Sequence, residues 1–258
     1  MEQFKILVFH TIFSENAFCL SKRLGIEVLN DFKAQDGITY LIFGAHDQAV
    51  NLFSIQRQNK NIKYIIINTE PPQSNHLKNK YFLTLMKENI VWDYHDLSKK
   101  YLESLDIRVY SMYFPEFVYT PVETPRPIDI LFVGSKNERR ISLERKLREK
   151  YPDKRIEFHM EWKHADQSEM RKLLQSAKVV LNVPYYDSNI LETHRIHFGL
   201  ACGCEVVSLY SGHEVIDKFY EPFVHFHHDL FEYFDGVDML PADMTEQKKK
   251  YPDLISTL

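Results

Sequence analysis

The chain has 258 residues, of which 44% are hydrophobic and 26% charged, with a formal net charge of -4. This composition excludes collagen, a disulfide-bonded scaffold and wholesale disorder. The balance of 32 Lys and Arg against 36 Asp and Glu argues against partners such as nucleic acid or an anionic membrane, which bind basic surfaces. At roughly 100 to 150 residues per domain, the length predicts two small domains or one large one.

The three cysteines, Cys19, Cys202 and Cys204, have no CxxC spacing, which argues against a disulfide framework and a zinc ribbon. We therefore expect a reducing, cytoplasmic environment. No apolar run approaches the roughly 18 residues of a membrane span, and the first residues lead directly into an apolar run typical of a strand. We expect no targeting segment and no membrane span.

The first half of the chain alternates short β-branched and aromatic runs with helical patterns. Several of the runs are continuously apolar, as in strands that are covered on both faces. The predicted strands are 5–10, 27–32, 39–43, 63–68, 89–93 and 108–113, and the helical patterns are 16–24, 47–59 and 76–87. This alternation predicts a parallel sheet with right-handed crossovers.

The middle of the chain is rich in proline. Pro115, Pro121, Pro125 and Pro127 are four of the eleven prolines. Proline lacks a backbone donor and biases the preceding residue toward extended geometry, so this stretch is typical of a linker. We predict an N-terminal domain over 1–118, a linker over 119–128 and a C-terminal domain over 129–258.

The second half repeats the alternation, with strands predicted over 129–133, 155–160, 178–183, 205–209 and 224–226. Asp166 and Glu169 have the spacing of a capping box, and Ser188 can cap a helix that continues through Cys202 and stops at Gly203 in a left-handed conformation. The chain is therefore predicted to be α/β, with two Rossmann-like domains whose parallel sheets face a central cleft. Open α/β sheets bind their ligands at such a place.

Polar residues follow several strands of the first half, among them His10, His46, Asp47, Glu70 and Asp93. Glu70 ends the most apolar strand and precedes two prolines, and a carboxylate so placed can take a proton from a hydroxyl group. It could equally hydrogen-bond a neighbouring loop. Asp47 is the second catalytic candidate, with a helix cap as its alternative role, and the histidines fit a core or loop position as well as a functional one.

Two places in the second half suit an anionic ligand. The strand 129–133 runs into Gly134 and Ser135 and then a helix that carries Arg139 and Arg140, and backbone N–H groups at such a helix start bind phosphate. A second strand ends at Asn182, and an aromatic loop containing Tyr185 leads to a helix that carries Glu192 and Arg195. Residues three apart share a helix face, so this last pair can bind one ligand or form an intrahelical ion pair.

Several catalytic motifs are missing from the sequence. The absence of GxGxxG, GxxxxGK[ST], GxSxG and HExxH argues against a dehydrogenase, a P-loop protein, a hydrolase and a zincin. No Asp-x-Asp occurs either, so a diphosphate held through a metal has no ligand motif. We predict a site without a metal, in which a helix dipole and arginine bind the anion.

At these segments the chain resembles the GT-B glycosyltransferases, in particular short members with a group-1-like C-terminal domain known from bacteria and large DNA viruses. The similar motifs are DILFVGS (129–135) with Arg139 and Arg140, VLNV (180–183), LETHR (191–195), GLACG (199–203) and VVS (206–208), and in the first half INTE (67–70) and VWDY (91–94). The chain departs from the family pattern in lacking a glutamate shortly before the Ala-x-Gly that ends the LETHR helix.

The resemblance implies that the second domain holds a nucleotide-sugar donor, that the first holds the acceptor, and that transfer needs no cofactor or essential metal. The donor-binding residues implied are Gly134, Ser135, Arg139, Arg140, Asn182, Tyr185, Glu192 and Arg195. Among them, Glu192 and Arg195 are assigned to the ribose and the phosphates.

We therefore expect a sugar to move from a UDP- or GDP-linked donor to an oligosaccharide acceptor, with Glu70 as general base in an inverting scheme. The expected compartment is the cytoplasm, or the host cytoplasm if the source is viral. Two alternatives are a nucleotide-sugar-binding module without catalysis and another nucleotide-sugar enzyme such as an epimerase.

Overall fold

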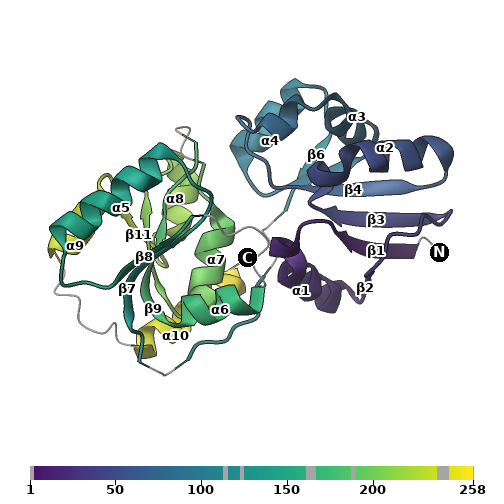
Figure 1. Cartoon of the computed structure of the whole chain (residues 1–258). Helices are drawn as coiled ribbons and strands as arrows, with labels where there is room; N and C mark the ends of the chain where they lie inside the picture. Colours follow the sequence, from purple (N-terminus) through teal and green to yellow (C-terminus); the bar gives the residue numbers. More distant parts are fainter. Residues whose placement is uncertain are drawn as a thin grey trace. The chain divides into compact units, whose positions relative to one another are not determined.

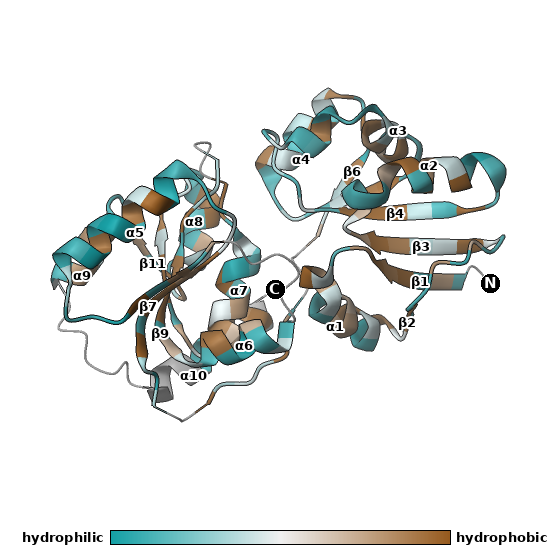
Figure 2. Ribbon diagram, in the orientation of Figure 1, coloured by the Kyte–Doolittle hydropathy of each residue, from teal (hydrophilic) through white to brown (hydrophobic). Residues whose placement is uncertain are grey.

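The computed structural model describes residues 3–112, 116–122, 125–160, 167–186, 190–236 and 244–257. Its contacts divide the chain into two compact units, Met1–Glu116 and Phe117–Leu258. In each unit, helices pack against a parallel β-sheet (Figure 1). The strands are largely hydrophobic, whereas the helices carry hydrophilic residues on their outer faces (Figure 2).

The first unit contains a six-stranded sheet in the order β2-β1-β3-β4-β5-β6, in which every neighbouring pair is parallel. The strands are β1 (Gln3–Val8), β2 (Glu27–Val28), β3 (Ile38–Phe43), β4 (Lys63–Asn68), β5 (Ile90–Asp93) and β6 (Val109–Ser111). The helices are η1 (Thr11–Phe13), α1 (Ser14–Leu24), η2 (Ala45–Gln48), α2 (Ala49–Gln58), η3 (Asn75–Lys78), α3 (Lys80–Glu88) and α4 (Asp96–Ser104), where η marks a 3-10 helix. Because the strands are parallel, their carboxyl ends meet at one edge of the sheet.

The central strand β3 is buried along its whole length. Tyr40 and Ile42 pack into a cluster on one face of the sheet, while Leu41 and Phe43 pack into a second cluster on the other face. Successive side chains of a strand point to opposite faces, so a strand covered on both faces has to be apolar throughout. This explains the continuous apolar run in the sequence.

The second unit contains a five-stranded parallel sheet in the order β11-β10-β9-β7-β8. The strands are β7 (Ile128–Val133), β8 (Ile156–His159), β9 (Ala177–Asn182), β10 (Glu205–Leu209) and β11 (His225–His227). The helices are α5 (Glu138–Lys150), α6 (Gln167–Gln175), α7 (Thr193–Ala201), α8 (Glu214–Tyr220), α9 (Leu230–Gly236) and α10 (Met244–Thr257). Alternate residues of β7 again divide between two cores, with Leu131 in one and Phe132 in the other.

The predicted fold class, α/β with two Rossmann-like domains, is confirmed. Every strand predicted from the sequence is present, although β2 ends at Val28 instead of residue 32. Asn30 and Asp31, which favour turns, bend the chain there. Helices α4 and α8 have no counterpart among the helical patterns of the sequence.

The predicted helix start at Ser188 is wrong in position, and both Ser188 and Asp166 lie outside the described residues. Helix α7 begins at Thr193, and Glu192 before it has a non-helical backbone. The Glu192 carboxylate accepts hydrogen bonds from groups outside the helix, which ties this residue to the preceding loop. The predicted end of this helix at a left-handed Gly203 is confirmed, because Gly203 has a φ of 74°.

The described part of the proline-rich segment after Phe117 belongs to the second unit and is bonded to its helices and strands. The Thr120 N–H donates to the Ala201 carbonyl (2.9 Å), and the buried Arg126 donates to the carbonyl oxygens of Ala177 (2.6 Å) and Cys202 (2.7 Å). Two of these carbonyls lie at or next to the end of α7, where a cation is favourable. A Cβ on Gly203 would lie 3.1 Å from the Arg126 guanidinium, so the glycine also leaves room for this contact.

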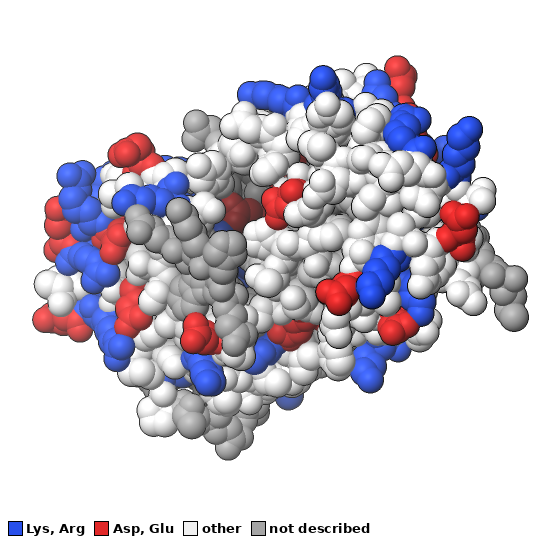
Figure 3. Space-filling view, turned by 45° about the vertical axis from the view of Figure 1, so that its right-hand side comes forward, with Lys and Arg blue, Asp and Glu red and all other residues white. Residues whose placement is uncertain are grey.

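Charge is distributed without a broad surface of one sign on the face shown in Figure 3, where Lys and Arg are mixed with Asp and Glu. This distribution agrees with the nearly balanced charge of the sequence. Among the helices of the described residues, none has the length and apolar character needed to cross a membrane.

We predict that Arg126→Met lowers the free energy of unfolding of the second unit by about 3 kcal/mol, because several buried carbonyls lose their donor. Urea denaturation measures this value. Arg145→Met is the matched control, since its side chain is 69% exposed and forms an ion pair with Glu149 on the same helix. The control should cost less than about 0.5 kcal/mol, and equal losses in both variants would contradict the assignment.

Candidate functional site

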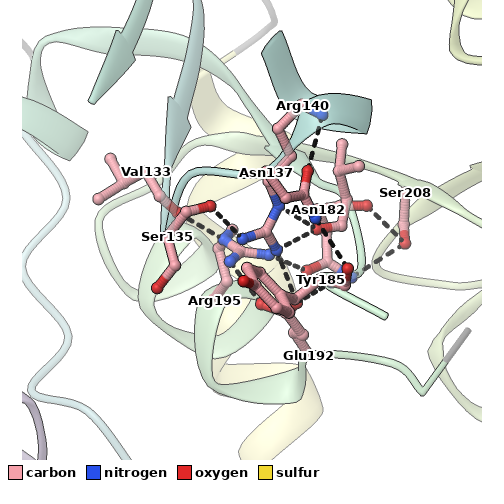
Figure 4. A network of polar contacts seen from close by, with 10 residues as sticks. Val133, Ser135, Asn137, Arg140, Asn182, Tyr185, Glu192, Arg195 and Ser208 are labelled. Carbon is pink, nitrogen blue, oxygen red and sulfur yellow. Dashed lines mark hydrogen bonds and ion pairs between the residues drawn. The ribbon is translucent and has the colours of Figure 1, made fainter. Parts of the chain in front are cut away.

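In the second unit, polar side chains meet at the carboxyl ends of β7 and β9 (Figure 4). Gly134 follows β7 and is closely approached by other groups. A Cβ there would lie 2.8 Å from Arg195 Nη2 and 2.9 Å from the Phe132 ring. The turn therefore needs glycine for space, because a larger residue would displace the Arg195 guanidinium.

Arg140 lies on the first turn of α5 and is 1% exposed. Its Nη1 donates to the Ser135 carbonyl (2.7 Å), its Nε to the Val183 carbonyl (3.2 Å), and its Nη2 to Glu192 Oε1 (2.7 Å). The helix start is fixed by Asn137, whose Oδ1 accepts from the Arg140 N–H (2.9 Å). Arg140 thus joins the turn after β7, the end of β9 and the residue before α7.

Glu192 and Arg195 complete the network. Glu192 Oε1 also accepts the Tyr185 N–H (2.8 Å), while Oε2 accepts from Arg195 Nη2. Arg195 Nε donates to the Val133 carbonyl (2.8 Å) and Nη1 to Asn182 Oδ1 (2.8 Å). The side chains of Glu192 and Arg195 are 30% and 12% exposed, so a ligand can reach both more easily than Arg140.

Charge in this network is unequal, with two guanidinium groups and one carboxylate. Burial lowers the pKa of Arg140 to about 10, and Glu192 opposes this shift, so the group stays protonated at neutral pH. The first residue of α7, Thr193, adds the partial positive charge of a helix N-terminus beside Glu192. The network of Arg140, Glu192 and Arg195 therefore has a net positive charge suited to an anion.

Most of the second-half candidates from the sequence come together here, namely Gly134, Ser135, Arg140, Asn182, Tyr185, Glu192 and Arg195. Within the described residues, Arg139 takes no part in this network and is partly exposed on α5. Asn137 and Ser208 were not among the site residues expected from the sequence. An asparagine before a predicted helix is a standard capping signal. Ser208 lies in the VVS motif, but its contact with Asn182 Nδ2, from which it accepts (3.0 Å), follows from the pairing of β9 with β10.

In the first unit, Glu70 follows β4 and is held by its neighbours. Its N–H donates to Asn68 Oδ1 (3.3 Å), and Asn68 Nδ2 donates back to the Glu70 carbonyl (3.0 Å). The Ser74 hydroxyl donates to Glu70 Oε2 (2.5 Å). The loop interaction considered as the alternative for Glu70 is thus present, and it also fixes the carboxylate in one orientation.

His46 lies between Glu70 and Asp47 at the carboxyl end of β3. Its Nδ1 is 3.6 Å from Glu70 Oε1, and its Nε2 is 3.6 Å from Asp47 Oδ1. The ring also contacts His76, with 4.5 Å between ring centroids. Burial lowers the pKa of His46 more than the two carboxylates raise it. The sequence left His46 undecided, because the spacing of residues 46 and 70 does not reveal their contact.

A Cβ on Gly44 would lie 2.9 Å from the backbone nitrogen and Cβ of His10, which places the turns after β1 and β3 in close contact. Gly44 also has a φ of 71°, a conformation that other residues rarely adopt.

Within the described residues of the whole chain, no group of three or more His, Cys, Asp or Glu side chains is arranged to hold a metal ion.

Asp93 at the end of β5 is buried and does not reach the surface. Its Oδ2 accepts from Asn68 Nδ2 (2.7 Å) and its Oδ1 from the His95 N–H (2.8 Å). The N-terminus of α4 is capped by its neighbour His95, whose Nδ1 accepts from the Leu97 N–H (3.2 Å). Burial raises the pKa of Asp93 to about 6.

No protein-family model matches the chain, and no curated protein matches it significantly. Among solved structures, TarM aligns with 93% of this chain and 55% of its own, at 13% identity and a TM-score of 0.56. The Gap123 glycosylation-associated protein complex of Streptococcus agalactiae aligns with 85% of this chain and 51% of its own, at 12% identity and a TM-score of 0.49. Accessory secretory protein 1, 2 and 3 of Streptococcus pneumoniae aligns with 95% and 53%, at 9% identity and a TM-score of 0.48.

The similarity to TarM shows a shared fold, two Rossmann-like α/β domains in one chain. The chain spans about half the length of each of these three structures.

We predict that Asp93→Asn becomes more stable relative to the unsubstituted chain as the pH rises. A carboxyl group with a raised pKa in the folded state contributes stability below its unfolded pKa, and this contribution is lost as the pH rises through about 6. Asparagine keeps one of the two acceptor oxygens and carries no charge at any pH. Urea denaturation at pH 4 and pH 7.5 should show a relative gain of about 2 kcal/mol for the variant. A pH-independent difference would contradict the prediction.

Proposed function

We propose that the chain is a glycosyltransferase that moves a sugar from a nucleotide-sugar donor to a hydroxyl group of a glycan acceptor. The observation that supports this most is the network of Arg140, Glu192 and Arg195 at the carboxyl ends of β7 and β9. Rossmann-like sheets bind nucleotides at this edge. The excess of one positive charge suits a diphosphate, and the neighbouring carboxylate suits the hydroxyl groups of a ribose.

The residues of this network divide into two groups by exposure. Glu192 is the most exposed member and accepts the ribose hydroxyls, while Arg195 beside it contacts phosphate oxygens together with the N-terminus of α7. Arg140 is buried, so it positions Glu192 and contributes positive charge without contacting the donor. The remaining donor-binding residues proposed are Gly134, Ser135, Arg139, Asn182 and Tyr185.

In the proposed reaction, the acceptor hydroxyl attacks the anomeric carbon as the bond to the diphosphate breaks, which inverts the configuration. A carboxylate of the first unit, Glu70 or Asp47, accepts the hydroxyl proton. The cationic network stabilises the negative charge on the departing nucleoside diphosphate, a role that a metal ion fills where the protein supplies no such charge. A UDP- or GDP-linked sugar and an oligosaccharide acceptor are the substrates proposed.

A thermal-shift screen against UDP, GDP, CMP and dTDP sugars tests the donor site, because a ligand that binds the folded state raises its melting temperature. Incubation of the stabilising donor with oligosaccharides then tests transfer. Release of nucleoside diphosphate with sugar on the acceptor supports the proposal. Conversion of donor without acceptor would instead indicate an epimerase, and binding without turnover a non-catalytic module.

We predict that Arg195→Ala weakens donor binding about 10- to 100-fold in calorimetry, because it removes a charged donor at the phosphates. Arg195→Lys should recover only part of this loss, since lysine keeps the charge but cannot make the three bonds of the guanidinium fork.

Arg145→Ala is the control for this experiment, because Arg145 is an exposed arginine of α5. It should leave donor affinity unchanged. Unchanged affinity in Arg195→Ala, with the protein folded, would refute the placement of the donor site.

A further inference from the structure

Ser74, Glu70, His46 and Asp47 form an ordered row at the carboxyl ends of β3 and β4. We infer that this row is a proton relay, in which Asp47 contacts the acceptor hydroxyl, His46 takes the proton onward, and Glu70 positions the imidazole. The inference rests on the proposed function, and it assigns different roles to the two carboxylates that are candidates for the base.

Exposure separates Asp47 from the other three members of the row. Ser74 is 1% exposed, and the side chains of Glu70, His46 and Asp47 are 17%, 9% and 36% exposed. Both oxygens of Glu70 face protein groups, Oε2 the Ser74 hydroxyl and Oε1 the His46 ring. A residue that contacts substrate must reach the surface, and Asp47 is the member of the row that does so to the greatest extent.

The charge state of His46 fits a proton acceptor. The carboxylates of Glu70 and Asp47 raise its pKa, whereas burial and the neighbouring His76 and His10 lower it, and burial dominates. The imidazole is therefore neutral at neutral pH and can accept a proton. Once it is protonated, its positive charge lies between two carboxylates 3.6 Å away on either side, which stabilises the imidazolium.

The relay accounts for every atom of the transfer. The acceptor oxygen forms a bond to the anomeric carbon, and the bond from that carbon to the diphosphate oxygen breaks with its electron pair on the nucleoside diphosphate. The hydroxyl proton moves to Asp47 and from there to His46 Nε2. Nδ1–H of the ring faces Glu70 Oε1, and after product release the proton passes from the imidazolium to solvent.

Turnover measured as nucleoside diphosphate release distinguishes the two carboxylates. We predict that Asp47→Asn lowers kcat about 100-fold or more with little change in donor KM, because the group that receives the proton is lost. Glu70→Gln should lower kcat only about 10-fold, because His46 remains in place while the side chain that orients its ring loses its negative charge. Asp36→Asn, an exposed aspartate that precedes β3, is the matched control and should leave kcat unchanged.

A pH profile separates a relay from a purely structural role. Activity requires neutral His46, so it should fall as the pH drops through the pKa of this residue. Glu70→Gln removes a carboxylate that raises this pKa, and the acidic limb should therefore move to lower pH. NMR titration of His46, assigned by the loss of its resonance in His46→Gln, should show the same shift without any substrate.

Two results would overturn the inference: a loss in Glu70→Gln equal to or larger than that in Asp47→Asn, or an unmoved His46 titration in Glu70→Gln. Failure of the proposed function would appear differently, as the absence of turnover in the unsubstituted chain. Donor affinity reports on the second unit and should be the same in Asp47→Asn as in the unsubstituted protein.

Discussion

The candidate site of the second unit depends on one buried cation. A guanidinium removed from water costs several kcal/mol unless it is paired and hydrogen-bonded. Arg140 meets this requirement with the carbonyls of Ser135 and Val183 and the carboxylate of Glu192, which come from three separate segments. These segments are therefore fixed relative to one another. The other oxygen of Glu192 accepts from Arg195 and orients it. The position of the partly exposed Arg195 therefore depends on the contact between the buried Arg140 and Glu192.

Glycine has a specific use in this arrangement. The chain contains only eight glycines, which leaves few places for a phosphate loop rich in them. At Gly134 a single glycine makes room for the cationic network, because two guanidinium groups and an aromatic ring occupy the space that a side chain would need. Both guanidinium groups lie over the same Phe132 ring, at 4.8 and 5.0 Å from its centroid. The positive charge comes from arginine side chains, in place of the backbone N–H groups of a multi-glycine loop.

The two units present opposite charges at the carboxyl ends of their sheets. The second has two guanidinium groups around one carboxylate, whereas the first has two carboxylates around one imidazole that is neutral at neutral pH. The proposed glycosyl transfer uses both kinds of site, one that stabilises a leaving anion and one that accepts a proton. Neighbouring residues of the first unit have other roles. Asp93 follows an adjacent strand, yet its burial and its bond from Asn68 make it part of the core.

Local sequence predicted the strands and the chemistry at their ends. Continuous apolar runs such as that of β3 identified strands covered on both faces. Polar residues after such runs gave the candidates Glu70 and Asp47, and the helix that follows β9 gave the candidates Glu192 and Arg195. The reason is that the loops at the carboxyl ends of parallel strands share one edge of the sheet. The start of α7 could not be predicted, since the contact that holds Glu192 outside the helix comes from Arg140, 52 residues earlier.

The sequence by itself determined the α/β class, the strand positions and the residue types available at each sheet edge, because period and composition are local properties. Only the tertiary structure decided which of those residues touch. It placed His46 between two carboxylates that are far apart in the chain, made Arg140 a buried support for Glu192, and packed Arg126 of the proline-rich segment against the end of α7. These contacts depend on strand order and register, which pair distant segments and leave no periodic signal in the sequence.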